Sequence, residues 1–168
     1  VLLAACGTGD HGGRAASAAP AHRIVSLSPA VTELLFAIGA GDRMVGRTTW
    51  CDYPPDARLV PSVGDGLSPD LEAVVAARPD LVVLYRSARN EAAADQLGRM
   101  GIAALLLPQD RLEDLANAAR TLGRVTDRQS AGDSLANAIA RVLAAPAPAL
   151  GLRIAVVAWD NPPMVIGA

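Results

Sequence analysis

The chain has 168 residues, and its apolar content of 51% is sufficient for the core of one ordinary domain, which excludes wholesale disorder. Its 15 basic and 17 acidic residues nearly cancel, which argues against a protein that holds nucleic acid by bulk charge. No run of about twenty apolar residues predicts a transmembrane helix. The sequence does not begin with methionine and stops soon after a strand-like segment, so we expect it to be part of a longer chain.

The first six residues resemble the lipobox that ends the signal peptide of bacterial lipoproteins. They read Val-Leu-Leu-Ala-Ala-Cys, with small residues directly before the cysteine that a signal peptidase can approach. We therefore expect Cys6 to carry a lipid that anchors an exported protein to a bacterial membrane. Residues 7–21 are rich in glycine, alanine and serine without periodicity, as in a flexible tether. The end of an ordinary signal peptide, or a short buried strand, is the alternative interpretation of residues 1–6.

From residue 22 onward the pattern alternates between strands and helices. Strands are predicted at residues 23–27, 44–49, 81–85, 103–107 and 153–159. Helices are predicted at residues 29–39, 71–77, 90–100, 110–122 and 126–145. Capping boxes are expected at Asp110 with Glu113 and at Thr126 with Gln129. This alternation predicts an α/β fold with a mainly parallel sheet flanked by helices.

Ligands of such sheets bind outside the carboxyl ends of the strands. The predicted binding rim therefore comprises residues 26–29, 48–53 and 85–89. Three of the five aromatic residues fall on this rim: Trp50, Tyr53 and Tyr85. Aromatic rings offer a large apolar area with a polar tip, which suits the binding of a flat ligand. Packing within the core or a loop is the alternative role, above all for Tyr53, because Tyr-Pro-Pro commonly fixes a loop.

The residues that catalysis or metal binding requires are not found on the rim. The two histidines, His11 and His22, fall in the tether and before the first strand, so neither is placed for general base catalysis. Neither a Gly-x-Ser-x-Gly motif nor a phosphate-binding loop is present. Cys6 and Cys51 lack the spacing of metal ligands, so we expect neither an enzyme nor a metal site. Cys51 is either a buried free thiol or paired with a cysteine elsewhere in the protein.

Several segments resemble the periplasmic substrate-binding proteins of ABC importers for iron-siderophores, haem and cobalamin. Residues 23–33, Arg-Ile-Val-Ser-Leu-Ser-Pro-Ala-Val-Thr-Glu, are similar to the opening of these proteins. Residues 51–57, Cys-Asp-Tyr-Pro-Pro-Asp-Ala, are similar to the cobalamin-binding branch. So is the order of three short segments further along the chain: Leu-Glu at 71–72, Arg-Pro-Asp-Leu-Val-Val at 78–83 and Tyr-Arg at 85–86. The Asn-Pro-Pro at residues 161–163 resembles the start of the second lobe in that branch. The resemblance covers residues 22–168.

This resemblance implies two α/β lobes joined by one long helix, with the ligand between the lobes. Residues 22–125 would form the N-terminal lobe and residues 126–145 the helix between the lobes. Residues 146–168 would begin the C-terminal lobe, most of which the sequence does not include. A rigid helical link implies only a small closure of the lobes when ligand binds.

By position, the resemblance also implies roles for single residues. Trp50 matches an aromatic that packs on the corrin ring, and Tyr85 matches a second cleft aromatic. Gly66 stands where a further cleft tryptophan is expected, so one flat wall of the cleft is missing. Glu72 matches an acidic residue that docks on arginines of the permease. Its alternative role is that of a first-turn glutamate that stabilises a helix dipole.

The leading hypothesis is therefore a monomeric, exported protein, periplasmic or at the cell surface, that binds cobalamin or a related corrinoid. It would deliver this ligand to an ABC permease with its ATPase and need no cofactor. A ferric siderophore, with Arg86 and Arg89 as anion-binding residues, or haem, with Tyr53 or Tyr85 as axial ligand, is the alternative within the same family. A lipid-anchored hydrolase and a surface lipoprotein without a ligand are more distant alternatives.

Overall fold

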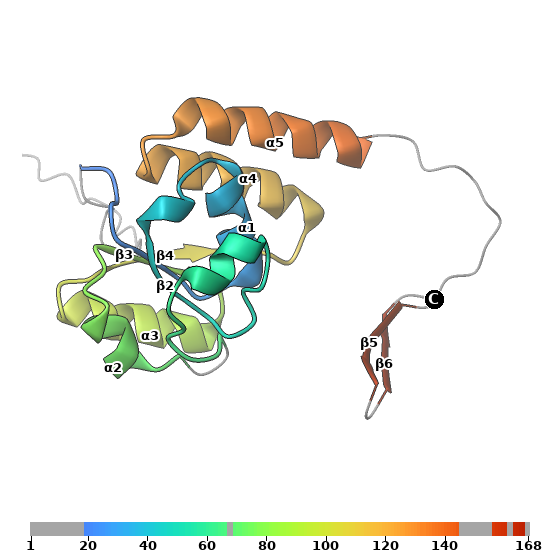
Figure 1. The fold of residues 1–168 in the computed structure, drawn as a ribbon. Helices are drawn as coiled ribbons and strands as arrows, with labels where there is room; N and C mark the ends of the chain where they lie inside the picture. Colours follow the sequence, from blue (N-terminus) through green and yellow to red (C-terminus); the bar gives the residue numbers. More distant parts are fainter. Residues whose placement is uncertain (1–18, 67–68, 145–155, 161–162, 167–168) are drawn as a thin grey trace, which may run out of the picture.

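A computed structural model of the chain describes residues 19–66, 69–144, 156–160 and 163–166 (Figure 1). One sheet contains four parallel strands in the order β2-β1-β3-β4: β1 (Ile24–Ser26), β2 (Met44–Arg47), β3 (Leu81–Tyr85) and β4 (Ala103–Leu107). The sheet confirms the α/β fold with parallel strands that the sequence predicts. Two further strands, β5 (Val156–Asp160) and β6 (Pro163–Ile166), pair as an antiparallel hairpin.

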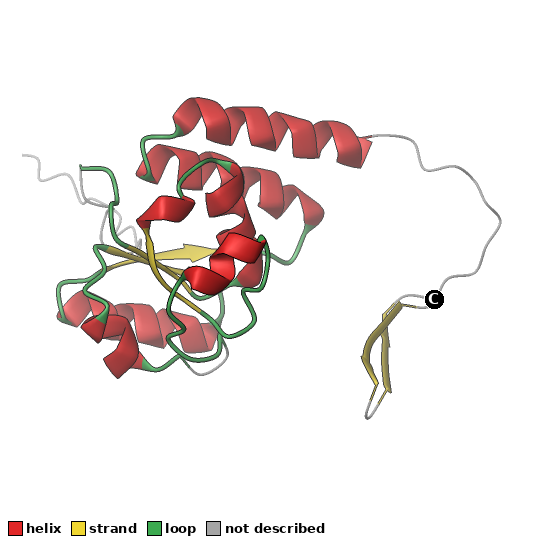
Figure 2. Cartoon of the chain, viewed as in Figure 1, coloured by secondary structure: helices red, strands yellow, loops and turns green. Residues whose placement is uncertain are grey.

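Helices cover both faces of the four-stranded sheet (Figure 2). One face carries α1 (Pro29–Ala37) and α4 (Leu112–Val125), with α5 (Gln129–Ala144) on the outer side of α4. The other face carries α2 (Leu71–Ala76) and α3 (Ala88–Arg99). Two short 3-10 helices, η1 (Gly41–Arg43) and η2 (Pro55–Leu59), flank strand β2 and its following loop.

The central strand β3 shows why this sequence forms a three-layered lobe. Successive side chains of a strand point to opposite faces of the sheet. Val83 packs in the core beneath α1 and α4, whereas Val82 and Leu84 pack in the core against α2 and α3. All three side chains are fully buried. A strand covered on both faces requires an unbroken apolar run, which the sequence supplies.

Helices α4 and α5 approach closely where two glycines meet. A Cβ atom added to Gly132 would lie 2.6 Å from the carbonyl oxygen of Ala119 and 2.9 Å from the Cα of Gly123. Only residues without a side chain fit such a contact. The helix predicted at residues 126–145 is thus observed as α5, packed on α4. Its role as a link between two lobes stays a prediction.

The first predicted capping box, Asp110 with Glu113, is wrong by one residue. The carboxylate of Asp114 accepts hydrogen bonds from the backbone N–H groups of Arg111 at 3.0 Å and Asp110 at 3.1 Å. The Asp110 carboxylate instead accepts a hydrogen bond from the phenol of Tyr85 at 2.6 Å. Helix α4 therefore begins at Leu112, after an extended Arg111.

The second predicted box, Thr126 with Gln129, is also wrong. Thr126 is fully buried, and its hydroxyl donates to the carbonyl oxygen of Leu122 at 2.7 Å. It therefore closes the last turn of α4, which extends to Val125 instead of ending at Leu122. Helix α5 begins only at Gln129.

Part of the sequence lies outside the described residues. Cys6 and residues 7–18 of the predicted tether belong to this part, as do residues 145–155 and 161–162. Of the predicted C-terminal lobe, only the β5–β6 hairpin is described. Among the helices of the described ranges, none is both long enough and apolar enough to cross a membrane.

Candidate functional site

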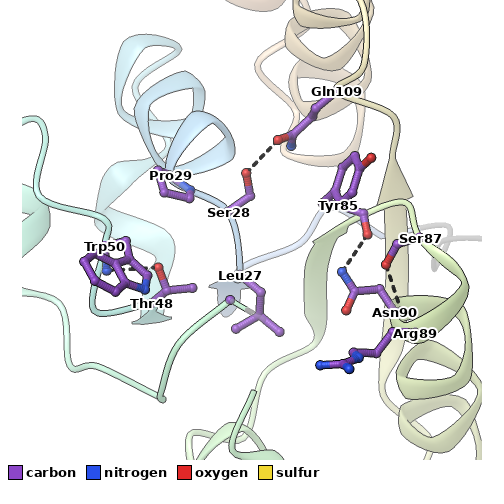
Figure 3. Close-up of a pocket in the computed structure, with 11 residues that line it drawn as sticks. Leu27, Ser28, Pro29, Thr48, Trp50, Tyr85, Ser87, Arg89, Asn90 and Gln109 are labelled. Atoms are coloured by element: carbon purple, nitrogen blue, oxygen red, sulfur yellow. Dashed lines mark hydrogen bonds between the residues drawn. The ribbon is translucent and has the colours of Figure 1, made fainter. Parts of the chain in front are cut away.

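A pocket of about 500 Å³ opens at the carboxyl ends of strands β1 and β3 (Figure 3). Its volume falls within the range of about 300–1,000 Å³ that is common for small-molecule sites. Eleven residues line it, eight from the three predicted rim segments and three from outside them: Leu27, Ser28, Pro29, Thr48, Trp50, Gly66, Tyr85, Ser87, Arg89, Asn90 and Gln109. The three rim segments predicted from the sequence therefore meet at one pocket.

Ser28 connects the end of β1 to the end of β4 across the pocket wall. Its hydroxyl donates to the amide oxygen of Gln109 at 2.9 Å instead of capping α1, which begins at Pro29. The amide nitrogen of Gln109 is buried and has no partner among the described residues. The rim predicted from the sequence omitted Gln109. Gln109 follows the parallel strand β4 after one proline. The rule that ligands bind outside the carboxyl ends of parallel strands therefore applies to it as well.

Tyr85 is held from two sides at the end of β3. Its hydroxyl donates to the Asp110 carboxylate at 2.6 Å. Its carbonyl oxygen accepts a hydrogen bond from the side-chain amide of Asn90 at 2.8 Å, and Ser87 caps α3 through the backbone N–H of Asn90. The hydrogen bond to Asp110, together with burial and the negative charge of that carboxylate, raises the pKa of the Tyr85 phenol above its ordinary value. The phenol therefore stays protonated at neutral pH.

Trp50 lies on the opposite side of the pocket from Tyr85, on the loop that follows β2 (Figure 3). Its side chain is 68% exposed, whereas the neighbouring Thr48 and Cys51 are buried. Cys51 is a buried free thiol among the described residues, and its pairing with a cysteine elsewhere in the protein stays the alternative prediction. A large exposed ring at a pocket edge leaves its apolar face available to a ligand.

Gly66 packs too tightly to be replaced by a larger residue. A Cβ atom at this position would lie 2.9 Å from the carbonyl oxygen of Leu27 and 3.4 Å from the Thr48 methyl carbon. The backbone itself therefore forms this part of the pocket wall. The tryptophan that the family resemblance leads one to expect here does not fit this backbone.

Two of the candidate ligand-binding residues lie outside the lining of this pocket. Tyr53 is 66% exposed on the loop after Trp50. Arg86 is also exposed, and its guanidinium lies 3.4 Å from the carbonyl oxygen of Leu106 on the neighbouring strand. Arg89, the second residue of α3, lines the pocket instead.

Glu72 lies on α2, away from the pocket lining. It is an exposed residue in the first turn, and its backbone N–H donates to the capping carboxylate of Asp70 at 3.0 Å. The guanidinium of Arg23 fixes the other end of α2, because it donates to the carbonyl oxygens of Ala77 at 2.7 Å and Arg78 at 2.8 Å. The Glu72 carboxylate is thus presented to solvent on a short helix that is held at both ends.

The pocket lining consists mainly of aromatic, aliphatic and uncharged polar side chains. Its lining combines two aromatic rings with uncharged polar side chains, and Arg89 is its one charged residue among those described. Among the described residues no histidine lines it, and the backbone N–H of His22, before β1, donates to the Asp80 carboxylate. Within the described ranges, no cluster of three or more histidine, cysteine, aspartate or glutamate residues could hold a metal ion. This arrangement suits the capture of a flat, mainly uncharged molecule.

Known proteins share both the sequence pattern and the fold. Residues 24–153 match a family described as periplasmic binding protein. The vitamin B12-binding protein of Salmonella paratyphi A is 40% identical over 102 residues, which cover 61% of this chain and 38% of that protein. The crystal structure of the periplasmic vitamin B12 binding protein BtuF of Vibrio cholerae has a TM-score of 0.66 at 27% identity, covering 74% of this chain and 49% of that chain. The periplasmic haem-binding protein BhuT, solved with two haems, has a TM-score of 0.64 at 27% identity and covers 71% and 46%.

The chain thus spans about half the length of the solved relatives and less of the curated one, which fits one lobe. The matches confirm the resemblance to periplasmic binding proteins and to their cobalamin-binding branch. Such proteins are exported and bind solutes, and they are not enzymes. Because the family match includes the sheet, its flanking helices and the pocket, the chain belongs to the periplasmic binding protein family.

Proposed function

We propose that this protein is the extracytoplasmic solute-binding component of an ABC importer and that its ligand is cobalamin or a related corrinoid. The observation that supports this proposal most strongly is the pair Trp50 and Tyr85, which face a mainly apolar pocket from opposite sides (Figure 3). Two such rings can contact the flat faces and edges of a macrocycle. The identity of 40% with a vitamin B12-binding protein supports the same ligand class.

The uncharged polar residues of the pocket also favour a corrinoid. Ser28, Asn90 and Gln109 offer hydroxyl and amide groups, which match the amide groups on the periphery of a corrinoid. Haem and most siderophores present anionic groups, for which several arginines are the preferred partners. Arg89 is the one such residue in the described lining.

Haem is the second candidate, because the haem-binding protein BhuT shares the fold at 27% identity. A tyrosine ligates ferric haem as phenolate. The hydrogen bond from Tyr85 to Asp110 raises the pKa of the phenol and so opposes this ionisation. Tyr53 lies outside the pocket lining. The described lobe therefore favours a ligand that needs no axial oxygen from the protein.

Calorimetric titration of the full-length protein with cyanocobalamin, haemin and a ferric hydroxamate tests the proposal. We expect one equivalent of cyanocobalamin to bind at least about tenfold more tightly than the other two, a difference of about 1.4 kcal/mol. At a hundredfold excess over the dissociation constant, the ligand should also stabilise the fold by about 2.7 kcal/mol. Tighter binding of haemin with a shifted Soret band, or no binding of cyanocobalamin, would contradict the proposed ligand.

Delivery to a permease is the second part of the proposal. Glu72 supports it, because its exposed carboxylate stands on the rigidly held α2 and can pair with a basic partner surface. Anchoring through a lipid on Cys6 is the third part, and residues 1–6 support it by their lipobox pattern. Fractionation of cells that produce the Cys6→Ser variant tests the anchor. The variant should move from the membrane to the soluble fraction, and retention in the membrane would refute the anchor.

A further inference from the structure

The loop that carries Trp50 is a tight turn closed by two side chains. The backbone N–H of Cys51 donates to the carbonyl oxygen of Thr48 at 3.2 Å, which makes these two residues the ends of a four-residue turn. The Cys51 sulfur lies 3.1 Å from the Thr48 hydroxyl oxygen. That oxygen also accepts a hydrogen bond from the backbone N–H of Trp50 at 3.3 Å. Trp50 therefore sits between two residues whose side chains contact each other.

The Cys51 sulfur also connects this turn to the interior of the lobe. It lies 3.1 Å from the hydroxyl oxygen of Thr32 on α1, which in turn lies 2.9 Å from the hydroxyl oxygen of Ser26 on β1. The Ser26 hydroxyl donates to the carbonyl oxygen of Ser28, at the pocket, at 3.0 Å. The Thr32 hydroxyl has one hydrogen, which it can donate either to the Ser26 oxygen or to the Cys51 sulfur. The thiol can donate its own hydrogen to the Thr48 hydroxyl oxygen. The contact between Cys51 and Thr32 thus joins the turn to the first strand–helix unit.

Burial makes this set of contacts rigid, whereas the tryptophan ring has little support of its own. Ser26, Thr32 and Thr48 are fully buried, and Cys51 is 1% exposed. Water does not compete for hydrogen bonds at such sites, so they hold the backbone more firmly than surface bonds do. The Trp50 ring is 68% exposed, so its position depends mainly on the backbone that carries it. A contact residue fixed before the ligand arrives loses less entropy on binding.

We propose that Ser26, Thr32, Cys51 and Thr48 form a positioning network that orients Trp50 for its ligand, with Cys51 as the central residue. The proposal rests on the proposed function, because it takes Trp50 as a ligand contact. In this role the thiol acts as a buried hydrogen-bonding group. It does not form a disulfide, and the ligand does not touch it.

A double-mutant cycle in the full-length protein tests the network, with cyanocobalamin affinity measured by calorimetry. Cys51→Ala should weaken binding about tenfold in the wild-type background, because the Trp50 ring is no longer pre-oriented. In a Trp50→Ala background the same substitution should change affinity by less than about twofold. Cys51→Ser keeps a donor and an acceptor at this position and should retain affinity within about threefold of wild type. Thr126→Val is the matched control, since it removes another fully buried hydroxyl far along the chain and should leave affinity unchanged.

Hydrogen exchange of the Trp50 amide in the ligand-free protein gives a readout that does not depend on the ligand. Cys51→Ala should accelerate this exchange at least about tenfold, and Thr126→Val should not change it. Equal loss of affinity in both backgrounds, or unchanged exchange in Cys51→Ala, would overturn the network. Failure of the wild-type protein to bind cyanocobalamin would refute the proposed ligand, and the exchange measurement would still decide the network.

Discussion

Replacement of Trp50 by alanine should weaken cyanocobalamin binding strongly while it leaves the fold intact. A buried tryptophan covers up to about 250 Å². The ring is 68% exposed in the described structure, so about 170 Å² remains available to a ligand. A flat ligand that covers half of this area removes about 85 Å² from water, which at about 25 cal/mol per Å² is about 2 kcal/mol. The dissociation constant should therefore rise about 30-fold.

The cost of association itself cancels between the variant and the wild type, so the difference in calorimetric affinity reports the lost contact. Leu59→Ala is the control, because Leu59 is 83% exposed and does not line the pocket. It should leave the dissociation constant unchanged. Urea unfolding of Trp50→Ala should show a midpoint close to that of wild type, since little of the ring is buried. A dissociation constant within twofold of wild type would refute Trp50 as a ligand contact.

Three further predictions follow from particular contacts. Gly132→Ala should destabilise the lobe by about 1–3 kcal/mol because its Cβ meets the Ala119 carbonyl oxygen. A Cβ atom at Gly98 would have nothing within 4 Å, so Gly98→Ala should instead stabilise α3 by up to about 1 kcal/mol. If urea unfolding showed that both substitutions change the free energy of unfolding in the same direction, this reasoning would be contradicted. Because Asp110 raises the Tyr85 pKa, their hydrogen bond contributes stability below the ordinary pKa of tyrosine and loses it as pH rises through the raised value. Asp110→Asn should lower the pH at which Tyr85 ionises. Absorbance titration follows this ionisation as the transition that Tyr85→Phe abolishes. A transition at the same pH in Asp110→Asn and wild type would argue against this pairing. Glu72→Ala should reduce cobalamin uptake by cells without changing affinity, whereas Glu91→Ala, a first-turn glutamate of α3, should change neither. Equal uptake for Glu72→Ala and wild type would exclude a docking role.

The sheet could be predicted from the sequence because its signals are local. The apolar run at residues 81–85 has the length of a strand, and it lacks the alternating polar residues of a strand with one solvent-exposed face. It therefore predicts a strand buried on both faces, as the structure has it. The rim segments followed from the general rule for parallel sheets, and they meet at one pocket as expected. Gln109 obeys the same rule, because it lies just beyond the carboxyl end of β4.

Other features depend on contacts between residues far apart in sequence. The carboxylate of Asp110 could cap a helix by its spacing, but in the folded lobe it accepts a hydrogen bond from Tyr85, 25 positions earlier in the sequence. Thr126 has the spacing of an N-cap, yet burial directs its hydroxyl to Leu122. The sequence alone suggests that Gly66 has replaced a tryptophan of the cleft. In the structure the Leu27 carbonyl oxygen lies so close that no side chain fits at this position. Tertiary packing decides which of several possible partners a side chain contacts. The spacing of residues along the sequence does not give this information.

The most direct test of the account is a crystal structure of the full-length protein with cyanocobalamin. We predict that the corrin ring lies over the carboxyl ends of β1 and β3 and contacts the rings of Trp50 and Tyr85, with Ser28, Asn90 or Gln109 bonded to its peripheral amides. A corrinoid bound on another surface, with Trp50 and Tyr85 both exposed to solvent, would contradict the central claim.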